Sequence, residues 1–181
     1  MKENLEIELK CLLNHEQFVI IAKKLPFSLP KLQKNTYYDT VNGELQKRHW
    51  MCRIREAAGN FEFTLKTPAD QGLNEFECPL ISDDINDPII LSFFRHHGIT
   101  SPLLPIGTSE TYRRKYTDEY GEWCLDENEF GGVTDYELEY ELSAYHKNAE
   151  NRFRVLLESC NVKYVQAKTK FERMIMYKKD R

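Results

Sequence analysis

The residues of this sequence that could do chemistry stand out as like-charged pairs two positions apart. Near the start of the chain, Glu6 and Glu8 flank Ile7. Side chains alternate between faces along a β-strand, so both carboxylates lie on one face. Neighbouring like charges repel, and a strand tolerates them where its face is open to water or where a cation lies between them. A hard divalent cation such as Mg²⁺ or Mn²⁺ takes oxygen ligands and suits such a pair.

The same spacing returns in later segments with both signs of charge. Arg53 and Arg55 share one face of a predicted strand, and Glu137 and Glu139 share one face of another. Arginine suits phosphate because its planar fork binds two oxygens. Carboxylates in phase are Glu6, Glu8, Glu62, Glu75, Glu77, Asp126, Glu137 and Glu139, and bases in phase are Lys10, Arg53, Arg55, Lys66, Arg113, Lys115, Lys168 and Lys170. This pattern predicts a highly charged anionic ligand, bridged to the carboxylates by a metal ion.

An ordinary antiparallel sheet with one solvated face would give much of this alternation. The grouping of like charges favours a ligand site instead, because strands of mixed sign would neutralise themselves. From pattern alone, both interpretations stay open.

The charged faces must be positioned by strands whose opposite faces are apolar. Beyond the first strand, we expect strands at 36–40, 51–56, 61–66, 73–80, 110–118, 122–127 and 135–142. Helices are predicted over 14–25, from a cap at Asp83 or Asp84 to Gly98, and over 145–160, with a loop at 26–35 and a last short strand or helical turn at 168–173. This favours a mostly antiparallel β core with about three helices packed outside, closing into a barrel with a polar lumen.

Composition is typical of one soluble globular domain, which we expect to span 1–181. Hydrophobic residues make up 41% of the chain and charged residues 30%, and the net charge of −4 does not favour nucleic-acid or membrane binding. The 5 cysteines are scattered without a CxxC pair, which favours reduced, mostly buried thiols in a cytoplasmic protein. We expect no signal peptide and no membrane span.

Taken in order, these residues resemble the CYTH superfamily, the triphosphate tunnel metalloenzymes. Glu6-Ile7-Glu8-Leu9-Lys10 matches its ExExK signature. Further matches are Tyr37-Tyr38-Asp39-Thr40, Arg53-Ile54-Arg55, Thr64-Leu65-Lys66, Glu75-Phe76-Glu77, Arg113, Leu125-Asp126, Glu137-Leu138-Glu139 and Thr169-Lys170. The sequence departs from the family at Asn74 and Thr111, where bases are usual. The resemblance covers nearly the whole chain and is closest to small bacterial single-domain members.

The resemblance implies an eight-stranded antiparallel tunnel that binds a triphosphate with Mg²⁺ or Mn²⁺. Glu6, Glu8 and Glu139 would bind the principal metal, with Glu137 and Asp126 beside it or at a second metal. Phosphate oxygens would be bound by Lys10, Arg53, Arg55, Lys66, Arg113, Lys115 and Lys170. Among these residues, Lys66, Arg55 and Glu139 are the predicted catalytic groups. Glu75 and Glu77 would orient the bases, hold a second metal or balance charge.

The residues and the resemblance leave three functions open. The first is metal-dependent hydrolysis of inorganic triphosphate or of an organic triphosphate, with a metal-activated water attacking the terminal phosphorus. The alternatives are an adenylyl cyclase that makes cyclic AMP from ATP, and a non-catalytic polyphosphate-binding module. In each case the partner is a small-molecule triphosphate, and the protein is a monomer or homodimer.

Overall fold

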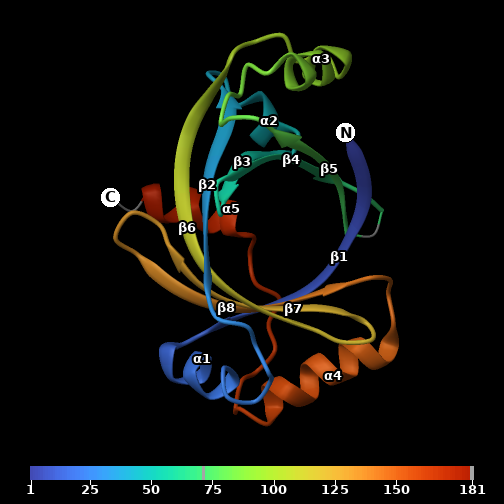
Figure 1. Cartoon of the computed structure of the whole chain (residues 1–181), viewed down its shortest axis with the longest axis vertical. Coiled ribbons are helices and arrows are strands. Elements are labelled where there is room, and N and C mark those ends of the chain that lie inside the picture. Colours follow the sequence, from blue (N-terminus) through green and yellow to red (C-terminus); the bar gives the residue numbers. More distant parts are fainter. Residues whose placement is uncertain (71, 180–181) are drawn as a thin grey trace. The chain divides into compact units, whose positions relative to one another are not determined.

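The computed structural model describes residues 1–70 and 72–179, in which eight strands close into a barrel in the order β1-β5-β4-β3-β2-β6-β7-β8 (Figure 1). The pairings of β1 with β8, β2 with β3, β3 with β4, β4 with β5, β6 with β7 and β7 with β8 are antiparallel. The strands are β1 (Lys2–Leu13), β2 (Lys31–Thr40), β3 (Met51–Ala57), β4 (Asn60–Pro68), β5 (Leu73–Leu80), β6 (Leu103–Thr117), β7 (Gly121–Glu129) and β8 (Thr134–Leu142). The predicted mostly β, closed antiparallel barrel is confirmed.

Two strands are longer than the sequence indicated. The predicted loop at 26–35 is wrong over its last part, because β2 begins at Lys31, directly after Pro30. Similarly, β6 begins at Leu103 rather than near 110. Apolar alternation is weak in both extensions. Asn35 of β2 is nevertheless buried, which shows that a polar side chain occupies a position where an apolar one was sought.

Five helices accompany the strands in the described part of the chain, where the sequence indicated about three. They are α1 (His15–Ile21), α2 (Glu44–Lys47), α3 (Pro88–His96), α4 (Lys147–Glu158) and α5 (Lys170–Lys179). The single turn of α2 is too short for a helical period to be visible. The tail, predicted as a short strand or helical turn, forms α5. No described helix is long and apolar enough to cross a membrane.

Capping side chains set where α1 and α3 begin. Asn14 and Gln17 form a reciprocal capping box at the start of α1, and the helix ends at Ile21 rather than at the predicted residue 25. The predicted cap of α3 at Asp83 or Asp84 is wrong. Asp87 caps it by accepting a hydrogen bond of 2.8 Å from the Ile89 amide, and the proline follows directly at the first helical position.

The described residues form two compact units that interleave in sequence. The first, which we call the arginine unit, contains Met1–Leu5 and Gln33–Ser109. In it, Ile54, Phe63 and Leu65 of β3 and β4 pack in one hydrophobic cluster with Phe94 of α3. Their strand neighbours carry charge on the opposite face, as the alternation predicts.

The second unit, which we call the carboxylate unit, contains Glu6–Leu32 and the chain from Glu110 onward. Trp123 of β7 stacks on Tyr140 of β8 with 3.8 Å between ring centroids. Both belong to a hydrophobic cluster with Phe18 of α1 and Phe153 of α4, the helices that cover this face of the two strands (Figure 1). The alternate side chains of β7 and β8 point to the other face, where the buried polar groups gather. The single domain expected over 1–181 stays a prediction.

Candidate functional site: a buried network of carboxylates and bases

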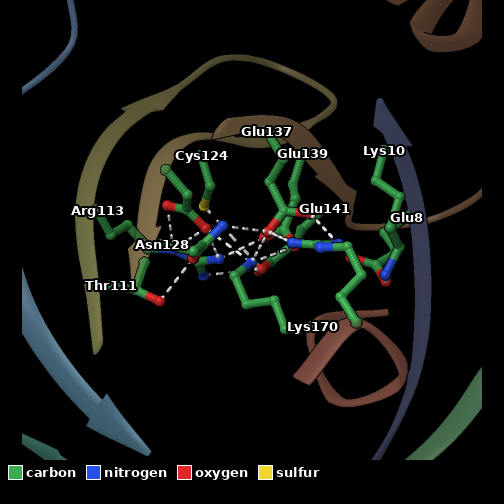
Figure 2. A network of polar contacts seen from close by, with 12 residues as sticks. Glu8, Lys10, Thr111, Arg113, Cys124, Asn128, Glu137, Glu139, Glu141 and Lys170 are labelled. Atoms are coloured by element: carbon green, nitrogen blue, oxygen red, sulfur yellow. Dashed lines mark hydrogen bonds and ion pairs between the residues drawn. The ribbon is translucent and has the colours of Figure 1, made fainter. Parts of the chain in front are cut away.

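The ammonium of Lys170, at the start of α5, lies among three carboxylates of the carboxylate unit. Its Nζ is 2.9 Å from Asp126 Oδ2 on β7 and 2.7 Å from Glu139 Oε1 on β8, and it also forms an ion pair with Glu137. Figure 2 shows Lys170 reaching into this group. The tail helix α5 therefore contacts the charged face, whereas the three helices that the sequence placed outside the barrel did not include the tail.

Arg113 of β6 is the second base in the network, and it uses both prongs of its fork. Its Nε and Nη2 donate to Asp126 at 2.9 Å and 2.6 Å, and Nη2 also donates to Glu139. Its Nη1 lies 3.3 Å from Glu141 Oε1. Because Arg113 and Asp126 are paired residues of the β6–β7 ladder, the register itself places this contact.

Mutual pairing keeps these buried groups ionised. Burial alone would raise the pKa of the Glu139 carboxyl, but Lys170, Arg113 and Lys10 outweigh it and hold that pKa well below its usual range. Burial would likewise lower the pKa of Lys170, yet the carboxylates Asp126, Glu137 and Glu139 raise it well above normal. Lys170, Arg113, Asp126 and Glu139 are therefore fixed charges at neutral pH.

Lys10, the last residue of the ExExK motif, joins this network from β1. It lies opposite Glu139 in the β1–β8 ladder and forms a buried ion pair with Glu8 (Figure 2). Desolvation would lower the pKa of Lys10, but Glu8 and Glu139 raise it overall. Lys115, by contrast, pairs with Glu122 at 2.6 Å and its side chain is 44% exposed. The structure therefore brings Lys10, but not Lys115, into the buried network.

Two groups of three carboxylates could each hold a metal ion. The oxygens of Glu6, Glu8 and Glu141 lie within 4.8 Å of one another, and so do those of Asp126, Glu137 and Glu139. The sequence placed Glu139 with Glu6 and Glu8 at one metal, whereas the structure places Glu141 with them. Sequence reasoning missed Glu141 as a site residue, although it is the third glutamate of the Glu137, Glu139, Glu141 alternation and shares their face.

Three half-buried carboxylates match the oxygen ligands that Mg²⁺ and Mn²⁺ prefer. Glu141 lies opposite Glu8 on one side and opposite Glu122 on the other. Like charges placed directly across a ladder destabilise a sheet, so a cation among these carboxylates would relieve the repulsion that remains beside the ion pairs of Glu8 with Lys10 and of Glu141 with Arg113. The Glu6–Glu8–Glu141 group therefore fits a divalent metal. In the other group, the ammonium of Lys170 already lies among the carboxylates.

The arginine unit holds the remaining predicted phosphate ligands on one face. Arg53 lies opposite Thr64 and Arg55 opposite Glu62 in the β3–β4 ladder. Lys66 Nζ is 3.3 Å from Glu75 Oε1 on β5. Charge balance is therefore one role that the structure gives to Glu75.

Glu77 lies on the same face of the arginine unit. Burial, Glu75 and Glu62 raise the pKa of its carboxyl, against the lowering effect of Arg53 and Arg55. On this face β3 thus contributes bases, β5 contributes carboxylates and β4 contributes one of each.

Polar side chains that the sequence analysis overlooked orient these groups. Asn35 of β2 accepts a hydrogen bond of 3.2 Å from Arg55 Nε and donates one of 3.4 Å to Ser109. The hydroxyls of Ser109 and Tyr37 are also hydrogen-bonded, at 3.3 Å. Asp39, from the same motif as Tyr37, accepts from backbone amides at the start of α2 and is structural.

Comparison with known proteins identifies the family. Residues 4–175 match the family model described as the CYTH domain, and this chain therefore belongs to the CYTH domain family. It is 29% identical to a Bacillus subtilis (strain 168) protein named "Putative triphosphatase YjbK", in an alignment 184 positions long that covers 96% of this chain and 95% of the relative.

Solved structures agree with this assignment. A Bacillus halodurans protein described as a "putative adenylate cyclase" is 31% identical, with a TM-score of 0.84 over 96% of this chain and 98% of that one. The Hippeastrum protein HpAC1 shares the fold at 22% identity, with a TM-score of 0.75 over 95% and 96% of the two chains.

Proposed function

We propose that this protein is a divalent-metal-dependent triphosphatase, acting on inorganic triphosphate or on an organic triphosphate. The observation that carries the proposal is the convergence of ionised carboxylates and bases on one buried face of the carboxylate unit. Phosphoryl transfer depends mainly on positioning and on neutralising charge, and needs fixed charges more than a nucleophilic side chain. The name given to YjbK, the relative from Bacillus subtilis, agrees with this activity.

Glu6, Glu8 and Glu141 would hold the metal, which would be Mg²⁺ or Mn²⁺. Such a metal polarises phosphoryl oxygens and lowers the pKa of a bound water. Glu139 and Asp126 keep Lys170 and Arg113 charged and in place, and these bases would bind phosphate oxygens together with Lys10.

Within the arginine unit, Arg53, Arg55 and Lys66 are the bases that would bind phosphate oxygens. Lys115 would bind phosphate oxygens from an exposed position, outside the buried network. Arg55 and Lys66 are the bases we expect to stabilise charge developing in the transition state. The substrate is a small-molecule triphosphate, and the five buried free cysteines favour a cytoplasmic location.

A cyclase is the second candidate, because the 31% identical Bacillus halodurans protein is described as one. The deciding experiment measures products from inorganic triphosphate, thiamine triphosphate and ATP, each with Mg²⁺, with Mn²⁺ and with excess chelator. We expect orthophosphate release that stops when the metal is removed. Cyclic AMP as the main product, with inorganic triphosphate left intact, would overturn the proposal in favour of the cyclase. Binding without any turnover would indicate a polyphosphate-binding module.

A further inference from the structure

Arg173 is a buried arginine on α5, one helical turn after Lys170, and only 2% of its surface is exposed. Its Nε donates to Asp135 Oδ2 at 2.8 Å, and its Nη2 donates to Glu137 Oε1 at 2.9 Å. Its Nη1 donates to Glu137 Oε2 at 3.1 Å and to the Lys168 carbonyl at 2.6 Å. Arg173 thus ties the first turn of α5 both to β8 and to the segment that precedes the helix.

Aromatic neighbours complete this anchor. The guanidinium of Arg173 lies 5.8 Å from the ring centroid of Phe130, and the Tyr177 hydroxyl donates to Asp135 at 3.1 Å. Burial alone would lower the pKa of Arg173, but Glu137 and then Asp135 raise it overall, so the group stays charged. A planar fork with several fixed donors loses less freedom per hydrogen bond than a lysine would.

Lys170 needs such an anchor, because it is the first residue of its helix and has a long flexible stem. Helix ends fray unless side chains hold them. Residues three apart share a helix face, so Lys170 and Arg173 point toward the same strand. Glu137 links them directly: its Oε1 accepts from Arg173 and forms the ion pair with Lys170.

We infer that Arg173 is a positioning residue, which holds α5 so that the Lys170 ammonium stays among Asp126, Glu137 and Glu139. Glu137 then serves mainly as the shared acceptor, since Asn128 also donates to its Oε1 at 3.0 Å. The effect on turnover rests on the proposed function, because Lys170 acts there as a phosphate ligand. The placement of Lys170 itself is independent of that function.

The test measures how accessible the Lys170 amine is, without any substrate. Reductive methylation with formaldehyde and a borohydride reagent, followed peptide by peptide by mass spectrometry, compares Lys170 with the exposed Lys179 of the same helix. In the unmodified protein we expect Lys170 to react at least about tenfold more slowly than Lys179, because local structure protects its amine. Arg173→Ala should remove most of this protection, and Arg173→Lys should restore part of it. Arg154→Ala, which removes a surface arginine from α4, is the matched control and should leave Lys170 protected.

Steady-state kinetics provide a second, independent test of the same inference. If Arg173 acts through Lys170, Arg173→Ala should raise KM or lower kcat in the normal background, yet change neither further in a Lys170→Ala background. Full protection of Lys170 in a folded Arg173→Ala variant would overturn the inference, and so would fully additive kinetic losses. If Arg173→Ala does not fold, Arg173→Lys and Tyr177→Phe give the same comparison with smaller changes. Failure of the unmodified protein to hydrolyse any triphosphate would reject the proposed function, while the methylation result would still decide the placement of Lys170.

Discussion

Glu8 of β1 and Glu141 of β8 lie directly opposite each other in the barrel ladder, and their carboxylates form one oxygen group with Glu6. Lys10, the paired cation of Glu8, also faces Glu139 rather than Glu141. The ladder register therefore sets the composition of the candidate metal-binding group. It adds Glu141, which lies outside the sequence motifs that resemble the CYTH family.

The first prediction concerns this group. Glu141→Gln and Glu8→Gln should each weaken Mn²⁺ binding by about tenfold or more, since even the partners of metal ligands act on that scale. In the metal-free protein Glu8→Gln should be destabilising, because it breaks the buried ion pair with Lys10. Glu141→Gln should change stability little, because it removes a cross-strand repulsion together with an ion pair to Arg113. Isothermal titration with Mn²⁺ and thermal melting without metal measure these effects. Glu127→Gln is the control, because Glu127 lies on the other face of β7, opposite Tyr136. Unchanged Mn²⁺ affinity in both variants would rule out this metal site.

The second prediction separates Glu137 from the metal ligands. Its carboxylate pairs with both Lys170 and Arg173, so Glu137→Gln leaves two buried cations with less compensation. Breaking a buried ion pair costs about 3–5 kcal/mol, and the retained amide oxygen should reduce that to about 2–4 kcal/mol of unfolding free energy. Urea denaturation gives this loss, and calorimetric titration should show a smaller change in Mn²⁺ affinity than for Glu141→Gln. An unaltered unfolding free energy with abolished Mn²⁺ binding would return Glu137 to the set of metal ligands.

The third prediction concerns acid stability and rests on Asp118, in the turn between β6 and β7. Burial would raise its pKa, but hydrogen bonds from Trp123 Nε1 at 3.0 Å and the Tyr140 hydroxyl at 2.7 Å, together with other donors, lower it to about 2. An unfolded aspartate has a pKa of about 3.9. The folded pKa is the lower one, so the carboxylate stabilises the protein above about pH 4 and this contribution is lost as the pH falls toward 2.

Thermal melting between pH 6 and 2 measures this effect. Asp118→Asn should melt lower at pH 6 and lose less stability than the unmodified protein as the pH falls from about 4 to 2. Parallel melting curves for the two proteins over that interval would show that Asp118 does not contribute to acid sensitivity.

The fold followed from the sequence because strand alternation has a period of two and marks one face of every strand. The same alternation placed Lys10 and Arg113 on the charged face, and the resemblance to the CYTH family made them candidate site residues. Lys170 lies on a helix and was named as a site residue through the resemblance of Thr169-Lys170 to a family motif. Alternation cannot give register, however, and register decides that Glu141 rather than Glu139 joins Glu6 and Glu8. Barrel closure sets that register through pairing between strands at opposite ends of the chain.

The sequence also did not reveal the polar side chains that hold other site residues in place. Asn35 lies in a stretch whose residues are polar on both faces, so no apolar period marked it as strand. Arg173 belongs to a helix whose apolar residues were too few to predict more than a turn. Both residues can be buried because each has a charged partner: Asn35 accepts a hydrogen bond from Arg55, and Arg173 donates one to Glu137.

The last prediction tests whether the phosphates, rather than an organic group, dominate recognition. Arg55 can offer a two-pronged, charge-assisted contact, and Asn35 orients it through Nε. Losing a hydrogen bond to a charged group costs roughly 1.5–3 kcal/mol. Arg55→Ala should therefore weaken the binding of inorganic triphosphate and of ATP by similar factors, on the order of 10- to 150-fold.

Arg55→Lys should recover only part of this loss, since lysine cannot reproduce the fork, and Asn35→Ala should cost less than Arg55→Ala because the guanidinium itself remains. Competition between inorganic triphosphate and ATP, measured as inhibition constants for each variant, gives these factors directly. Arg95→Ala removes an exposed arginine of α3 in the same unit and should change neither constant. A loss confined to ATP would mean that Arg55 recognises the nucleoside, and would turn the assignment toward a nucleotide-specific enzyme such as a cyclase.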